Sequence, residues 1–206
     1  MRNYEYIIAG LPVIGSGFRF TDTPPEQFIA DIREQLDSRD NALVDFLMKG
    51  YEEKNLTPEF YAEAVSHRNH FLREYFRFDL NLRNAKVRFL NKALGRPADK
   101  DLMVLYGKDG EPLVLPFEEA DAVEAILRGE DLLARERALD DLIWDRISSM
   151  TVFDYFDVEA VLAFIAKMQV VARWYRLDEQ SGREMFRRLV DEVRGTFKGV
   201  QYNAGQ

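Results

Sequence analysis

The sequence predicts an all-α protein, an elongated helical bundle of about seven helices built on one long central helix, with room for one small β-hairpin. Apolar residues recur every three or four positions along most of the chain, which is the spacing of one buried helix face. Thr and Pro open several of these stretches, as they commonly do at helix starts. With 206 residues, 47% of them hydrophobic, the chain can bury a sizeable core. We expect a single helical domain over residues 1–206, with two lobes, 1–98 and 99–206, as the alternative.

Two short helices are expected early in the chain. Thr23 is a suitable N-cap, and Pro24-Pro25 opens a helix that ends near Leu36. A second helix is expected from about Ser38 to Tyr51. The apolar run before them is interrupted by glycine and proline, so we expect it to belong to the fold rather than to a targeting segment.

The central helix is expected to begin at Pro58, after Thr57 as N-cap, and to end at Leu94, before Gly95. These 37 residues would span about 55 Å at about 1.5 Å per residue. One apolar row follows spacings of three and four residues: Phe71, Tyr75, Phe78, Leu82, Ala85 and Phe89. A second row lies beside it, so we expect at least two neighbouring elements to cover this helix.

The second half of the sequence begins with the candidate hairpin. Residues 102–106 and 111–115 flank a Gly107-Lys-Asp-Gly110 turn, and Pro112 restricts the second strand to a sheet edge. Four further helices are expected, over about 117–128, 130–148, 158–176 and 181–197.

Charge and composition exclude some classes of function. The net charge is −8, and residues 99–159 alone carry six basic and 17 acidic side chains, a net charge of −11. A general nucleic-acid binder needs a coherent basic face, so we expect no nucleic-acid partner. No segment has the roughly 18 uncharged apolar residues of a membrane span, so no membrane insertion is expected. The chain has no cysteine, which suits a cytoplasmic location.

One polar row could bind a metal. Glu63, His67, His70 and Glu74 would share a face of the long helix, and carboxylate and imidazole are good transition-metal ligands. Helical di-metal sites, however, take ligands from several helices. The same row also matches ordinary stabilising pairs on a helix surface. We therefore expect no metal and no cofactor, and keep a helical metalloenzyme as an alternative.

A second polar cluster lies within the apolar part of the same helix: Asp79, Asn81, Arg83 and Asn84. Buried polar groups must be hydrogen-bonded, so we interpret the cluster as a structural network that holds neighbouring helices in register. The alternative is contact with a partner.

Two charged rows near the end of the chain are candidates for partner binding. The acidic row contains Asp140, Asp141 and Asp145, and the basic row contains Arg173, Arg176, Arg183 and Arg187. A solvated surface is the ordinary interpretation of the acidic row. The basic row suits one face if two helices meet at a short turn near Asp178.

Three stretches resemble a bacterial family of unknown function encoded within V-type ATPase gene clusters: residues 4–12, residues 78–84, and residues 153–164 with Arg173-Trp174. The last stretch is also distantly similar to the end of the C/d-type central-stalk subunit of V/A-type ATPases. In that resemblance the counterparts are Glu159, Leu162-Ala163-Phe164, Arg173 and Arg176. The C/d-type subunit is longer and has three helical lobes, whereas this chain has room for about two.

The resemblance implies a non-enzymatic accessory or central-stalk component that couples the rotor shaft to the membrane ring. Its partners would be V-type ATPase subunits, and it would lie in the cytoplasm, peripheral to the inner membrane through the complex. The alternative from another class is a soluble helical protein-binding module unrelated to ATPases.

Overall fold

The computed structural model describes residues 4–15, 23–174 and 176, and all of its regular elements are helical. The expectation of an all-α fold is thereby confirmed. The elements are α1 (Tyr4–Gly10), α2 (Pro25–Gln35), α3 (Ser38–Lys49), the 3-10 helix η1 (Glu53–Asn55), α4 (Pro58–Val65), α5 (His70–Ala93), α6 (Ala120–Leu127) and α7 (Leu132–Met150). A further helix covers residues 158–174.

Several helices begin where side-chain caps are available. The Asp37 carboxylate accepts hydrogen bonds from the backbone N–H groups of Arg39 and Asp40 at the start of α3. Thr57 accepts from the N–H of Phe60, with Pro58 in the first turn of α4, as the sequence predicted. Because these caps satisfy N–H groups that the helix itself leaves unpaired, they fix where each helix starts.

The predicted 37-residue helix is wrong, because the structure divides it into α4 and α5. α4 ends at Val65, and Asn69 has extended backbone angles, φ −68° and ψ 127°. The Asn69 side chain accepts a hydrogen bond from the N–H of Leu72, 3.0 Å away, and thereby caps a new helix. α5 has 24 residues, about 36 Å at about 1.5 Å per residue.

The expected β-hairpin is a hairpin-shaped loop without strands. Tyr106 and Pro112 form an isolated antiparallel bridge. Two backbone hydrogen bonds flank it, from Gly107 N–H to the Glu111 carbonyl (2.8 Å) and from Leu113 N–H to the Leu105 carbonyl (2.7 Å). Pro112 has no N–H to extend this pairing. We call residues 98–116, which include this loop, the arm.

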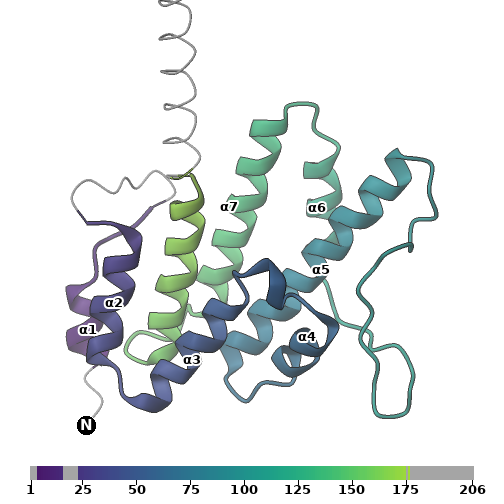
Figure 1. The fold of residues 1–206 in the computed structure, drawn as a ribbon. Coiled ribbons are helices and arrows are strands. Elements are labelled where there is room, and N and C mark those ends of the chain that lie inside the picture. Colours follow the sequence, from purple (N-terminus) through teal and green to yellow (C-terminus); the bar gives the residue numbers. More distant parts are fainter. Residues whose placement is uncertain (1–3, 16–22, 175, 177–206) are drawn as a thin grey trace, which may run out of the picture.

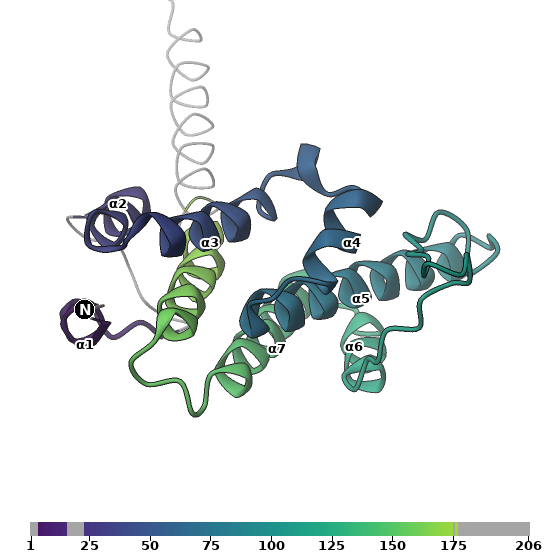
Figure 2. The same cartoon turned by 90° about the horizontal axis from the view of Figure 1, so that it is seen from below.

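Figures 1 and 2 show how these elements are arranged. α1, α2 and α3 lie at one end of the molecule, and the arm lies at the other end, where it turns back from the C-terminal end of α5 and runs alongside this helix. The helix at 158–174 runs between α2–α3 and α7. α4 packs against α5, and α5 also contacts α6 and α7. α5 is therefore central to the molecule, although it is shorter than the sequence predicted.

The main core combines apolar residues from α1, α2, α3, α4, α5, α7 and the helix at 158–174. Four members of the predicted apolar row on α5 are buried, because Phe71, Tyr75, Phe78 and Leu82 are each at most 7% exposed, whereas Ala85 and Phe89 are only partly buried. Phe78 and Leu82 belong to a second cluster with residues of α6 and α7. Among the helices that the structure describes, none is long and apolar enough to cross a membrane.

Candidate functional site

The polar row considered for metal binding is divided by the break between α4 and α5. Glu63 lies on α4, His67 in the connection, and His70 and Glu74 on α5. Glu74 pairs with Arg77 and, more distantly, with Arg73. Burial lowers the pKa of His67, and its Nδ1 accepts a hydrogen bond from the N–H of Asn69. Within the described ranges, no group of three or more His, Cys, Asp or Glu side chains is placed to hold a metal ion.

The cluster around Asp79 links α4 to α5. The Asp79 carboxylate accepts hydrogen bonds from the Tyr61 hydroxyl and from Nε of Arg83 at 2.7 Å. Burial raises the pKa of Tyr61, and the neighbouring Asp79 charge acts in the same direction. Tyr61 therefore stays protonated and serves as a hydrogen-bond donor to Asp79.

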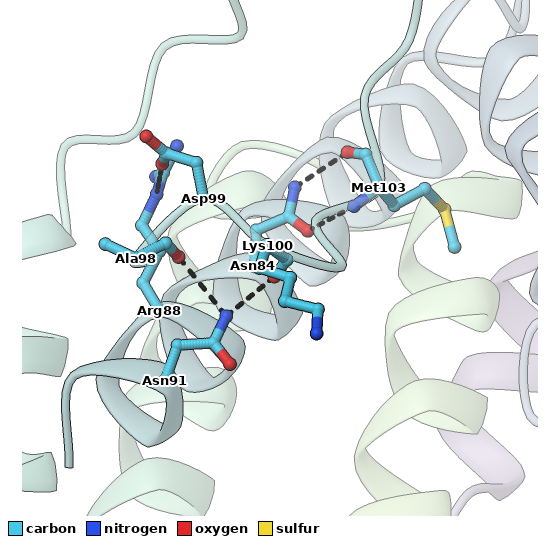
Figure 3. A network of polar contacts seen from close by, with 7 residues as sticks. All are labelled: Asn84, Arg88, Asn91, Ala98, Asp99, Lys100 and Met103. Carbon is cyan, nitrogen blue, oxygen red and sulfur yellow. Dashed lines mark hydrogen bonds and ion pairs between the residues drawn. The ribbon is translucent and has the colours of Figure 1, made fainter. Parts of the chain in front are cut away.

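The two asparagines of the same predicted cluster, Asn81 and Asn84, form hydrogen bonds with the backbone of the arm. Asn84 donates to the Met103 carbonyl (2.9 Å) and accepts from the Met103 N–H (3.0 Å), as Figure 3 shows. Asn81 donates to the carbonyl of Pro116 at 3.0 Å. Asn91, which the sequence prediction did not include, is 4% exposed and donates to the Lys100 carbonyl at 2.6 Å.

The predicted acidic row divides between the interior and the surface. Asp140 is 5% exposed, and its carboxylate accepts hydrogen bonds from the Arg173 guanidinium and from Nε1 of Trp174. Nη1 of Arg173 also forms an ion pair with Oε2 of Glu136, 3.5 Å away. Asp140 and Arg173 were predicted as partner contacts, but the structure pairs them with each other because the helix at 158–174 packs on α7.

The other members of the two charged rows are differently placed. Asp141 and Asp145 are exposed on α7, and Arg176, the last described residue, is helical and exposed. Arg183 and Arg187 lie outside the described residues. Asp141, Asp145 and Arg176 are therefore the members that the structure presents to solvent.

The connection between α7 and the next helix exposes a group of apolar side chains. Val152, Phe153, Tyr155 and Phe156 are 53%, 85%, 67% and 58% exposed. We call residues 152–156 the aromatic turn; Figure 2 shows its connection at the margin of the molecule. The turn is locally ordered, because the Asp154 N–H donates to the Thr151 carbonyl at 3.1 Å.

A hollow of about 820 Å³ lies beside residues 157–159, which directly follow the aromatic turn in the chain. Asp157 and Glu159, at the start of the helix at 158–174, form one wall, and other lining residues include Tyr4, Leu43, Arg39 and Arg68. Its volume is typical of a ligand or side-chain pocket. The sequence prediction missed this pocket because α1, α3, α4 and the later helix each contribute to it.

Two acids of this pocket wall are held by specific hydrogen bonds. Asp157 accepts from the N–H of Ala160 at 3.0 Å and caps the helix. Glu159 accepts from the Asn69 side chain at 2.8 Å. Burial raises the pKa of Glu159, and the charges of Asp157 and Asp154 raise it further. Both side chains are therefore preoriented in an environment rich in negative charge.

The fold and these features define an all-α protein that displays an aromatic turn next to an acidic pocket. The chain belongs to the family described as "Protein of unknown function (DUF2764)", which matches residues 51–196. The expected membership of a family of unknown function is thus confirmed, while the link to V-type ATPases stays a prediction. No curated protein and no solved structure matches the chain.

Proposed function

We propose that this protein is a non-enzymatic interaction component of a V-type ATPase, related to the C/d-type central-stalk subunit, and that it connects the rotor shaft with the membrane ring. The observation that carries the interaction role is the aromatic turn, whose four large apolar side chains are each more than half exposed. Contiguous exposed apolar groups commonly mark protein-binding surfaces, and aromatic residues are enriched among those that dominate binding energy.

The choice of partner rests on the sequence resemblance. The aromatic turn overlaps the stretch, residues 153–164, that is similar to the end of the C/d-type subunit. Within that stretch Leu162 and Ala163 are buried, whereas Phe153, Tyr155 and Phe156 are exposed. This division supports a helix that anchors the turn in the fold and a turn that contacts a neighbouring protein.

The test is affinity purification from the native host, with V-type ATPase subunits quantified by mass spectrometry. The test variant replaces Phe153, Tyr155 and Phe156 by Ser. A matched control replaces Tyr106, Leu113 and Val114 by Ser, because these arm residues are also exposed and apolar. We expect the wild type and the control to recover ATPase subunits, and the test variant to recover about tenfold less, equivalent to about 1.4 kcal/mol of binding free energy.

The choice of partner and the choice of contact surface can each be contradicted by a separate result. If the wild-type protein recovers no ATPase subunit even at low salt, the ATPase assignment is wrong and an unrelated helical binding module is the better account. If the test variant recovers ATPase subunits as well as the wild type does, the aromatic turn is not the contact.

A further inference from the structure

We infer that the aromatic turn and the acidic pocket form one docking surface for a partner segment in which an arginine lies between apolar residues. This inference rests on the proposed interaction function and specifies the chemistry of its partner. The two features are continuous in the chain, because the turn ends at Phe156 and the pocket wall begins at Asp157. A single segment crossing this boundary would meet aromatic rings first and carboxylates next.

The charge of the pocket favours a cationic occupant. Among the described residues that line it, the carboxylates are those of Asp40, Glu63, Asp157 and Glu159, and the guanidinium groups are those of Arg39 and Arg68; the Asp40 carboxylate already accepts a hydrogen bond from Tyr4. The lowered pKa of His67 keeps its imidazole neutral at pH 7, so this residue does not offset the acids. A guanidinium that enters the pocket would reduce the excess of negative charge, so a cationic side chain is electrostatically complementary to this pocket.

Asp157 and Glu159 are the expected contacts, because neither takes part in an ion pair with a Lys or Arg among the described residues. Each uses a carboxylate oxygen in the hydrogen bond to Ala160 or Asn69, and these bonds hold the two carboxylates in place. Burial and then the charge of Asp157 raise the pKa of Asp154, so a cation here would also relieve repulsion between two acids. Arginine suits this arrangement better than lysine, since its planar group presents several N–H donors at once.

The apolar part of the partner is assigned to the aromatic turn. Phe153, Tyr155 and Phe156 offer large faces that lose water when an aliphatic side chain covers them. A guanidinium can also lie against an aromatic ring, which adds to its attraction at the edge of the turn. The partner segment is therefore an arginine with apolar neighbours rather than a run of basic residues.

The experiment uses the full chain and two synthetic peptides. Both have the sequence acetyl-Gly-Leu-Xaa-Leu-Gly-amide, where Xaa is arginine in one and citrulline, its uncharged counterpart, in the other. Binding is followed by NMR titration. We expect the arginine peptide to bind about tenfold more tightly than the citrulline peptide and to shift the resonances of residues 152–159 and of the Asn69 side-chain amide.

The matched variants isolate the charge of the pocket. Asp157→Asn with Glu159→Gln removes two charges but preserves an oxygen acceptor at each position, so the helix cap and the bond from Asn69 can persist. The control, Asp121→Asn with Glu130→Gln, removes two exposed charges elsewhere. We expect the preference for arginine to disappear in the first variant and to stay within about twofold of the wild type in the control. Glu159→Gln alone should lose part of the preference and serves as the test if the double variant is unfolded.

Three outcomes overturn the inference. They are equal binding of the two peptides, resonance shifts confined to other surfaces, and the lack of saturable binding by either peptide. A fourth contrary outcome is self-association, which analytical ultracentrifugation measures. If the wild type forms a dimer and the Asp157→Asn, Glu159→Gln variant does not, the surface binds a second copy of this chain. None of these results depends on recovery of ATPase subunits, so the inference and the proposed function can fail separately.

Discussion

Asn69 connects two parts of the chain through one side chain. Its Oδ1 accepts from the N–H of Leu72 and starts α5, while its Nδ2 donates to Glu159, 90 positions later. The first bond could be anticipated, because asparagine is a favoured N-cap. The second could not, because nothing in the local sequence indicates that Glu159 approaches this loop.

Glu159 should make stability depend on pH. Burial, the first cause, and the neighbouring acids raise its pKa above the usual 4.5. The carboxyl group thus binds its proton more tightly in the folded protein than in the unfolded chain. Its stabilising contribution is fully present below pH 4.5 and is lost as the pH rises through the raised pKa.

We therefore expect Glu159→Gln to gain stability relative to the wild type between about pH 4 and about pH 7. Since this side chain is only half-buried, solvent screening should keep the change under about 1 kcal/mol. Urea unfolding of both proteins at several pH values measures it. A stability difference that is constant across this range, or that moves in the opposite direction, would show that Glu159 does not titrate as described.

Phe78 should be a major contributor to stability. It is 3% exposed and lies in the cluster shared with α6 and α7. Phe78→Ala should lower the free energy of unfolding by about 3–5 kcal/mol, because it removes buried surface and leaves a cavity. Phe153→Ala is the matched control, because it makes the same substitution at an 85% exposed position. It should change the free energy of unfolding by under about 0.5 kcal/mol. A loss below about 1 kcal/mol for Phe78→Ala in chemical denaturation would contradict its burial.

At the scale of elements, the spacing of apolar residues predicted correctly that α5 is helical, but it did not predict where the long helix is broken. The apolar row of α5 was predicted correctly because its side chains recur every three or four residues. The break at residues 66–69 was missed because apolar residues continue on both sides and no proline or glycine interrupts them. Ser66 and Asn69, two residues that favour helix ends, were the available signal.

The arm should depend on Asn84. This side chain makes both of its hydrogen bonds to the backbone of Met103, so Asn84→Ala leaves those groups without their protein partner. The expected local cost is about 1–3 kcal/mol. Hydrogen exchange should become faster within residues 98–116 while α7 stays protected.

Arg88→Ala provides the control for Asn84→Ala. Its exposed ion pair with Asp99, at 3.2 Å, should contribute under about 1 kcal/mol. If both variants leave hydrogen exchange in the arm unchanged, other contacts hold the arm in place.

For the whole molecule, the main core determines which parts depend on one another. It unites Ile7 and Leu47 from the first half with Ile147 and Leu162 from the second. The all-α class could be predicted from composition and spacing, but this shared core could not, because it depends on contacts between residues far apart in the sequence. The pairing of Asp140 with Arg173 and the pocket beside Glu159 could not be predicted either, because they also depend on contacts between distant parts of the sequence.

We expect residues 1–98 alone to lack a stable fold, because removing the second half uncovers the main core and the part of α5 that contacts α6 and α7. Circular dichroism of this fragment should show little helix and no cooperative thermal transition. A cooperative transition would instead support the alternative of two lobes, 1–98 and 99–206.

The arm also provides a practical way to locate this chain inside a larger assembly. Its tip, Asp109–Gly110, is exposed, and Leu105 is the buried core residue of the arm. Exposed loop tips tolerate inserted sequence far better than packed helices do. We expect a small fluorescent or epitope tag at this tip to leave the helices intact, so that its position in electron micrographs would mark the end of the molecule opposite α1.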